Sequence, residues 1–326
     1  MKKIICLLLS VLMLVSAMAF VGCSEEPTLK MGVGVFVDVS KASNATADKA
    51  GEGKAAVTAA IITVDEDGKV VACQLDTAET TVKYDATGKA QAVTDLRTKY
   101  EKGTEYNMVA YGNATKEWFE QADAFEALVV GKTLDEIKAL VAEGDKGTAD
   151  VIAAGCTIMI DEFVGAIEKA FANLAESTAT AESALKLGMN TAVTNKDATA
   201  DKAGQSKVET TVFAAAVDAE GKVLAAKTDC AQITFTFDNA GASTYDLTKA
   251  VATKREQGMN YNMVAYGGAT KEWFEQADAF EALCVGKTAA EIAAFCAADN
   301  YGTADVKAAG CTILVDGFTK AAAKIG

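Results

Sequence analysis

The chain has 326 residues and a formal net charge of −14, and it contains no histidine. The missing histidines exclude Ser-His-Asp triads, histidine general bases and histidine metal ligands. The acidity argues against nucleic acid and anionic lipid headgroups as partners, because such contacts need clusters of lysine and arginine.

The first residues have the pattern of an export signal. Two lysines precede an almost uninterrupted apolar run at residues 4–20, and small residues then lead to Cys23. This ending looks like the lipobox of bacterial lipoproteins, so we expect a signal peptide at residues 1–22 and a lipidated tether at residues 23–28. The lipid on Cys23 would hold the protein on the outer face of the cell membrane. A simple secretory signal is the alternative.

One segment of the chain occurs twice. Residues 106–128 and 261–283 are identical at 22 of 23 positions, and only Asn113 against Gly268 differs. Each copy is followed at the same spacing by a short cassette, DVIAAGCTI or DVKAAGCTI. The sequence therefore predicts two tandem homologous domains and a linker, at residues 29–174, 185–326 and 175–184.

Each copy is expected to begin with β structure. Polar, small-residue segments that start at Leu29 and Ala45 are interpreted as loops. Three short antiparallel strands should follow, with Gly68 in the turn between the first two. The expected strands of the first copy lie at residues 57–64, 70–75 and 82–84, and those of the second lie at 210–217, 223–227 and 233–237.

The second part of each copy is predicted to be helical, which makes the fold class α+β. In the first copy a charged helix is expected at residues 95–102. Thr115 should cap a longer helix that carries Trp118 on its buried stripe. A short strand at residues 156–160 then leads to a last helix capped by Asp161. The same order is expected 155 residues later in the second copy.

The cysteines do not indicate a disulfide framework. Only Cys156 and Cys311 occupy corresponding positions in the two copies, and no CxxC spacing suggests a metal centre. Most of the thiols are interpreted as small buried hydrophobes. Redox chemistry at Cys156 and Cys311 is a less favoured alternative, because neither has a basic residue or a second cysteine beside it.

A lipobox, tandem units with a β meander, an ATKEW helix and an AGCT segment before a final helix resemble the flavinylated lipoproteins of Gram-positive flavin-based extracellular electron transfer. More remotely, they resemble the FMN-binding domain of Rnf and Nqr subunits. The resemblance implies an FMN-binding-domain-like fold in each copy. It also implies two covalent FMN groups, each joined through its phosphate to a threonine hydroxyl by a separate flavin transferase that uses FAD.

The resemblance places the acceptor hydroxyls at Thr157 and Thr312. The small residues before each threonine leave room for close approach of a phosphate. The alternative is that each threonine simply packs in a strand. Core packing is favoured over flavin stacking for both tryptophans, and Lys116 and Lys271 either pair with a phosphate or are solvated. The candidate cofactor-binding residues are Thr157, Thr312, Gly155, Gly310, Cys156, Cys311, Asp150, Asp305, Met108, Met263, Trp118 and Trp273.

These observations favour a redox carrier that is not itself an enzyme. It would receive electrons from a membrane donor and pass them to extracellular acceptors, with FMN supplying the chemistry. A cofactor-free lipoprotein that binds a ligand or a cell-surface partner through duplicated modules is the alternative.

Overall fold

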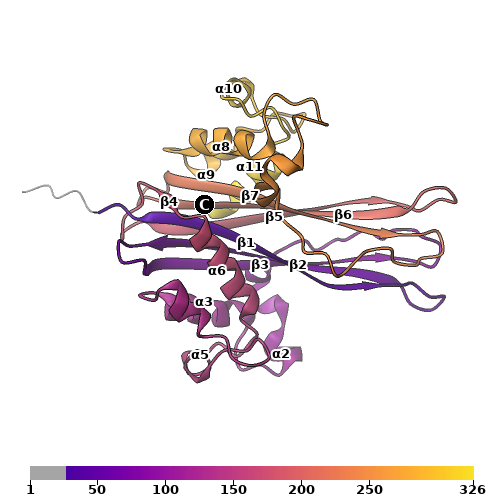
Figure 1. Ribbon diagram of the computed structural model, residues 1–326, viewed down its shortest axis with the longest axis horizontal. Helices are drawn as coiled ribbons and strands as arrows, with labels where there is room; N and C mark the ends of the chain where they lie inside the picture. Colours follow the sequence, from indigo (N-terminus) through magenta and orange to yellow (C-terminus); the bar gives the residue numbers. More distant parts are fainter. Residues whose placement is uncertain (1–26) are drawn as a thin grey trace, which may run out of the picture.

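The computed structural model describes residues 27–326, and the predicted signal peptide and Cys23 lie outside this range. Two antiparallel sheets pack face to face, and helices cover their outer faces (Figure 1), which confirms the α+β class. The strands are β1 Lys30–Ser43, β2 Gly51–Val64, β3 Val70–Tyr84, β4 Ala175–Glu176, β5 Ala184–Lys196, β6 Gly204–Val217 and β7 Val223–Phe237. The helices of the first repeat are α1 Lys99–Lys102, η1 Gly103–Tyr106, α2 Met108–Gly112, α3 Trp118–Val129, α4 Leu134–Lys138, α5 Ala149–Ala154 and α6 Asp161–Ala172. Those of the second are α7 Lys254–Gln257, η2 Gly258–Tyr261, α8 Trp273–Cys284, α9 Ala289–Ala293, α10 Ala304–Ala308, α11 Asp316–Ala322 and η3 Ala323–Ile325.

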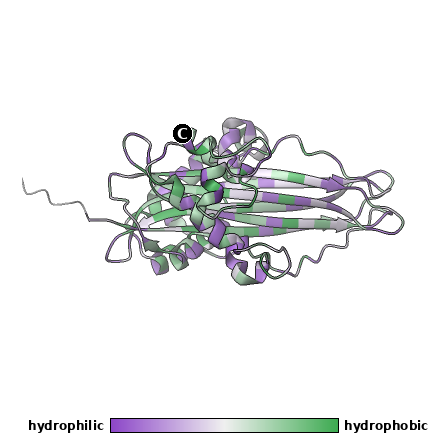
Figure 2. Ribbon diagram, turned by 90° about the horizontal axis from the view of Figure 1, so that it is seen from above, coloured by the Kyte–Doolittle hydropathy of each residue, from purple (hydrophilic) through white to green (hydrophobic). Residues whose placement is uncertain are grey.

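Each repeat forms its own meander. The strand order is β3-β2-β1-β4 in one sheet and β5-β6-β7 in the other. The central strand β2 is buried on both faces: Ala59 and Ile61 face the other sheet, whereas Ala60 and Ile62 face the helices. This burial explains why its sequence is an apolar run rather than an alternation. Figure 2 shows apolar residues distributed along the strands and over the helices that cross them.

The predicted strand boundaries were wrong in two places. A loop was expected at the start of each repeat, but β1 begins at Lys30 and pairs with β2 along its length. The expected second and third strands are one continuous strand, β3. Between the two expected strands, Thr77 is buried, and its hydroxyl shares a hydrogen bond of 2.8 Å with the Thr58 hydroxyl of β2.

The predicted linker is ordered. Its first two residues form β4, which pairs with β1. The Ala179 carbonyl accepts a hydrogen bond of 2.8 Å from the Leu29 backbone, and the Ala179 side chain is buried. The segment therefore packs on the first sheet before the chain enters β5.

Helix ends also differ from the prediction. The first charged helix is shorter than expected and is capped by Thr98, whose hydroxyl accepts from the Glu101 backbone. The cap of α3 is Glu117 rather than Thr115. Asp161 is the first residue of α6 and not its cap. None of the helices within residues 27–326 is long and apolar enough to cross a membrane.

The two repeats are related by approximate two-fold symmetry, because their contacts are reciprocal. The rings of the corresponding residues Tyr84 and Phe237, which end β3 and β7, stack with their centroids 4.1 Å apart. Corresponding loops are joined by two reciprocal backbone hydrogen bonds, and corresponding helical segments are joined by two reciprocal ion pairs. These pairs are Ala45 N to Gly241 O (2.7 Å), Ala198 N to Gly88 O (2.8 Å), Lys169 to Glu256 (2.7 Å) and Lys324 to Glu101 (2.8 Å).

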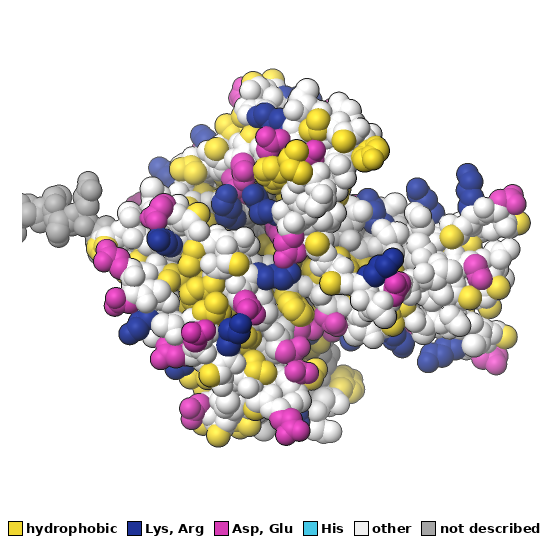
Figure 3. Space-filling model, in the orientation of Figure 1, with side chains coloured by type: hydrophobic (Ala, Val, Ile, Leu, Met, Phe, Trp, Pro, Cys, Tyr) yellow, Lys and Arg dark blue, Asp and Glu magenta, His cyan; other side chains and the backbone are white. Residues whose placement is uncertain are grey.

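The inner faces of the two sheets form a single hydrophobic core. Val33, Val57 and Ile61 of the first repeat belong to the same buried cluster as Val212 and Ile233 of the second. Two further cores lie between each sheet and its own helices. The helical layers therefore lie on opposite sides of the molecule, and the strands extend beyond them at the right of Figure 1. Lysine and arginine side chains project from this extension in Figure 3.

Candidate functional site

The GCT cassette follows α5 at the outer edge of the helical layer. Gly155 ends this helix with φ of +105°, in the left-handed region that favours glycine. The chain then reverses, so that Cys156 is fully buried while Thr157 is exposed. The strand predicted at residues 156–160 is absent within the described chain, and only a single bridge joins Met159 to the preceding loop.

A glutamine from α3 holds each candidate threonine. The side-chain oxygen of Gln121 accepts hydrogen bonds from the Thr157 backbone (2.8 Å) and the Thr157 hydroxyl (2.9 Å). Its amide nitrogen donates to the Lys116 carbonyl at 3.0 Å. Gln276 and Thr312 repeat these contacts at 2.8 and 3.0 Å. The threonine hydroxyl is therefore oriented by its bond to a buried amide, and it stays open to solvent on its other side.

A lysine side chain approaches the same cassette. A Cβ atom placed on Gly155 would lie 2.3 Å from Lys116 Nζ, and one on Gly310 would lie 2.4 Å from Lys271 Nζ. Glycine is therefore favoured at this position for two reasons: it can adopt the positive φ angle, and it leaves space for the ammonium group.

The cap residue of α3 holds the neighbouring loop. The buried Glu117 carboxylate accepts hydrogen bonds from the Met108 and Val109 backbones, at 2.9 and 3.3 Å. Asn107 adopts the left-handed conformation just before them. Glu272 makes the same contacts in the second repeat, at 2.9 and 3.2 Å. One helix turn thus positions both the Tyr-Asn-Met loop and the threonine.

A cavity of about 340 Å³ opens beside Thr157. This volume is in the range of small-molecule sites. The Lys99 ammonium lies 5.4 Å from the centre of the Tyr106 ring and 5.7 Å from that of Trp118. The cavity therefore combines aromatic surface with a cation next to an exposed hydroxyl. Its lining residues are Thr77, Lys99, Tyr106, Met108, Trp118, Lys146, Thr157, Ile158, Met159, Asp161, Glu162 and Phe163.

The inner wall of this cavity is polar. The Thr58 hydroxyl lies 2.8 Å from both the Thr77 hydroxyl and the Glu162 carboxylate. Burial raises the pKa of the Glu162 carboxyl, although the Thr58 hydrogen bond opposes this shift. In the second repeat Cys230 and Gly317 occupy the positions of Thr77 and Glu162.

The cassette cysteines are part of the core. Cys156 and Cys311 are both fully buried beneath the helices. Burial raises the pKa of each thiol to about 11, although Lys116 and Lys271 partly oppose the shift. Because the thiolate is the reactive form, these positions are unsuited to thiol redox chemistry near neutral pH.

In the first repeat the structure brings together five of the six predicted site residues. Thr157, Met108 and Trp118 line one cavity, and Gly155 and Cys156 place the threonine beside it. Trp118 is 3% exposed and packs edge-on against Phe163, which agrees with the expected core packing. The remaining candidates, Asp150 and Asp305, do not join this group, because they lie exposed in the first turns of α5 and α10.

Sequence reasoning missed three contributors: Glu117, Gln121 and Lys99. A signal for the first two was available in the repeat itself. The segment that contains them is identical at 22 of 23 positions, whereas the central strands β2 and β6 agree at only 4 of 14. Recent duplication alone would have preserved both. The two repeats are thus more alike in this segment than in the strands beneath it.

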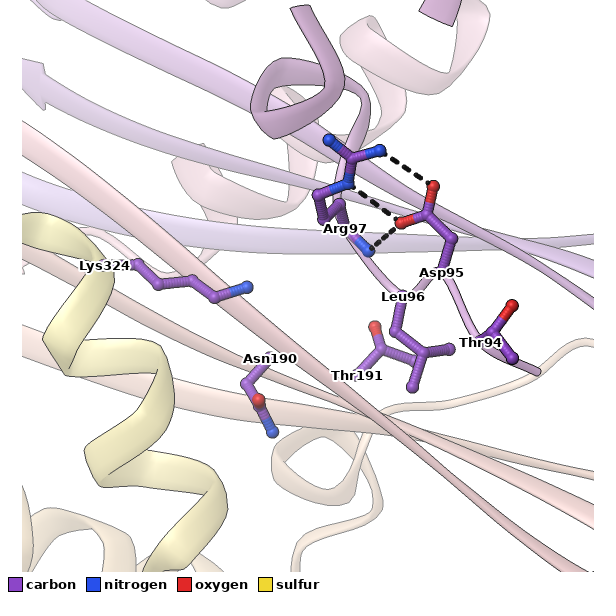
Figure 4. Close-up of a pocket in the computed structure, with 7 residues that line it drawn as sticks. All are labelled: Thr94, Asp95, Leu96, Arg97, Asn190, Thr191 and Lys324. Atoms are coloured by element: carbon purple, nitrogen blue, oxygen red, sulfur yellow. Dashed lines mark hydrogen bonds and ion pairs between the residues drawn. The ribbon is translucent and has the colours of Figure 1, made fainter. Parts of the chain in front are cut away.

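A second depression, of about 470 Å³, lies where the two repeats meet (Figure 4). It is bordered by residues 94–97, by Asn190 and Thr191 of β5, and by Lys324. Its charged groups already have partners: Arg97 pairs with Asp95, and Lys324 pairs with Glu101. These pairs favour a structural role for this depression.

Within residues 27–326 no group of three or more cysteine, aspartate and glutamate side chains is placed to hold a metal ion. Comparison of the chain with protein-family models, with curated proteins and with solved structures finds no match.

Proposed function

We propose that the protein is a membrane-anchored extracellular electron carrier with one FMN joined by a phosphoester to Thr157 and another to Thr312. Each repeat is one FMN-binding unit in this proposal. The observation that carries it is the cavity beside Thr157, where an exposed, oriented hydroxyl adjoins aromatic surface and a lysine. FMN would match these groups, because it has a flat apolar ring at one end and an anionic phosphate at the other.

The residues present fit this cofactor in the first repeat. Trp118, Tyr106 and Met108 would contact the ring, and Lys99 would provide positive charge near it. FMN supplies reversible electron transfer, and the protein's part is to orient the ring and limit its contact with water. Lys254 lies over the Tyr261 and Trp273 rings in the same way, at 5.3 and 5.8 Å.

The proposed partners are a flavin transferase, a membrane electron donor and extracellular acceptors, with lipid on Cys23 as the anchor. A covalent link would be useful outside the cell, where a dissociating cofactor is lost. The two proposed attachment positions are exposed in helical layers on opposite sides of the double sheet. Each flavin would therefore exchange electrons with external partners independently of the other.

The test is co-expression of the full chain with a flavin transferase, followed by measurement of the intact mass. We expect two FMN adducts on the unaltered chain, one on either single variant, Thr157→Ala or Thr312→Ala, and none on the double variant. Thr115→Ala with Thr270→Ala is a matched control, because both of these threonines are exposed nearby. Absence of any adduct on the unaltered chain would contradict the proposal and favour a cofactor-free binding protein.

A further inference from the structure

We infer that Lys116 and Lys271 form anion sites that hold the phosphate joined to Thr157 and Thr312. The inference rests on the proposed attachment of FMN. It assigns the phosphate of FMN to Lys116, which lies against Gly155. Lys99 lies over the Trp118 ring and would be near the flavin ring instead.

The first observation is that this ammonium group has no protein partner. Lys116 Nζ makes no hydrogen bond or ion pair with any residue in 27–326, and the same is true of Lys271. Lys99, by comparison, lies 3.6 Å from the Glu79 carboxylate and over two aromatic rings. A half-buried cation without a carboxylate is unexpected in a chain with a net charge of −14.

The second observation is that the residues that position Thr157 also position Lys116. Gln121 bonds the Lys116 carbonyl with its nitrogen and Thr157 with its oxygen, so one amide couples the two residues. Gly155 leaves the space that the ammonium group occupies. Both features recur in the second repeat within 0.1 Å. The lysine is thus held at the backbone of the Gly-Cys-Thr turn rather than left free in solvent.

The chemistry of attachment leaves a negative charge on the bound phosphate. A bond forms between Thr157 Oγ1 and the phosphorus of FAD next to the riboflavin, and the bond from that phosphorus to the bridging oxygen breaks, so that AMP leaves. Gln121 orients the hydroxyl, but an uncharged amide is not a base, so the transferase must supply the group that takes the proton. The product phosphodiester keeps one negative charge, which the Lys116 ammonium group would neutralise.

The test measures the rate of flavin attachment at each threonine separately, by peptide mass after timed co-expression of the full chain with the transferase. We expect Lys116→Met to slow attachment at Thr157 at least ten-fold and to leave Thr312 unchanged. Lys271→Met should have the reverse effect. The second threonine is thus an internal control for folding and for the amount of transferase.

Two further variants separate charge from structure. Lys116→Arg keeps the positive charge and should retain most of the attachment rate at Thr157. Lys89→Met removes an exposed lysine elsewhere and should change neither rate. Equal rates at both threonines in Lys116→Met would overturn the inference while leaving the proposed function intact. An unaltered chain without any adduct would instead remove the proposed function itself.

Discussion

The two repeats place the same side chains around their threonines, although the strands beneath those side chains differ. Gln121 and Gln276 make matching hydrogen bonds to their threonines, and Glu117 and Glu272 hold matching loops. Below them, a threonine and a glutamate of the first repeat are replaced by a cysteine and a glycine in the second. The outer cassette was therefore constrained more strongly than the core that supports it.

A second difference concerns a buried glutamate at the same position of α3 and α8. Glu281 pairs with Arg255 at 2.6 Å and with Lys227 at 2.9 Å. In the first repeat Tyr100 and Gln74 replace these two cations. Burial then raises the pKa of Glu126 to about 8. One position thus holds a compensated charge in one repeat and an uncompensated one in the other.

The largest expected effect comes from removing the compensating cation. Arg255→Met leaves the Glu281 carboxylate, which is 4% exposed, without its arginine. We expect a loss of about 3 kcal/mol in the free energy of unfolding, measured in urea, because the buried Glu281 carboxylate then keeps Lys227 as its one cationic partner. Tyr100→Phe, the matched change in the first repeat, should cost less than about 1 kcal/mol. Equal losses would contradict this comparison.

Replacing Glu126 or Glu281 by glutamine should change the free energy of unfolding at high pH in opposite directions. The folded-state pKa of Glu126, about 8, lies above its ordinary value of 4.5, so its contribution to stability is complete below pH 4.5 and is lost as the pH rises through 8. Glu126→Gln should therefore have little effect at pH 5 and stabilise the protein at pH 8.5 by about 2 kcal/mol, given its partial exposure.

Glu281→Gln is the matched control for this pH dependence. It removes a partner from Arg255 and Lys227, so it should destabilise the protein at both pH values by about 2 kcal/mol. Urea unfolding at pH 5 and pH 8.5 checks both variants. Destabilisation of both variants at pH 8.5 would show that Glu126 is charged and compensated in the folded protein.

The smallest expected effect tests the symmetry between the repeats. Lys169 pairs with Glu256, Lys324 pairs with Glu101, and all four side chains are about 30% exposed. Lys169→Met and Lys324→Met should each cost about 0.5 kcal/mol, as is usual for partly exposed ion pairs. Lys169 also donates to the Val35 carbonyl at 2.9 Å, so Lys169→Met should give the larger of the two losses. The losses should be additive in thermal unfolding, and a larger loss for Lys324→Met would contradict this expectation.

The helical half of each repeat was more predictable than the strands. The stripe that begins at Trp118 follows helical periodicity and packs inward as expected. The strands were harder because β2 is buried on both faces and β3 carries buried polar residues, which hides the alternation that predicts a strand. The candidate threonines were chosen through the family resemblance, which also left Lys116 between phosphate pairing and solvation. Gln121 could not be assigned from spacing, since 36 residues separate it from Thr157.

The sequence by itself determined the duplication, the α+β class and the threonine cassettes, because repeated segments, local periodicity and small residues are properties of neighbouring positions. Only the tertiary structure decided that the repeats share an inner core, that their cassettes lie in helical layers on opposite sides of the sheets, and that Gln121 bonds Thr157. These features depend on contacts between distant segments, and burial and hydrogen bonding select them only when the chain is folded.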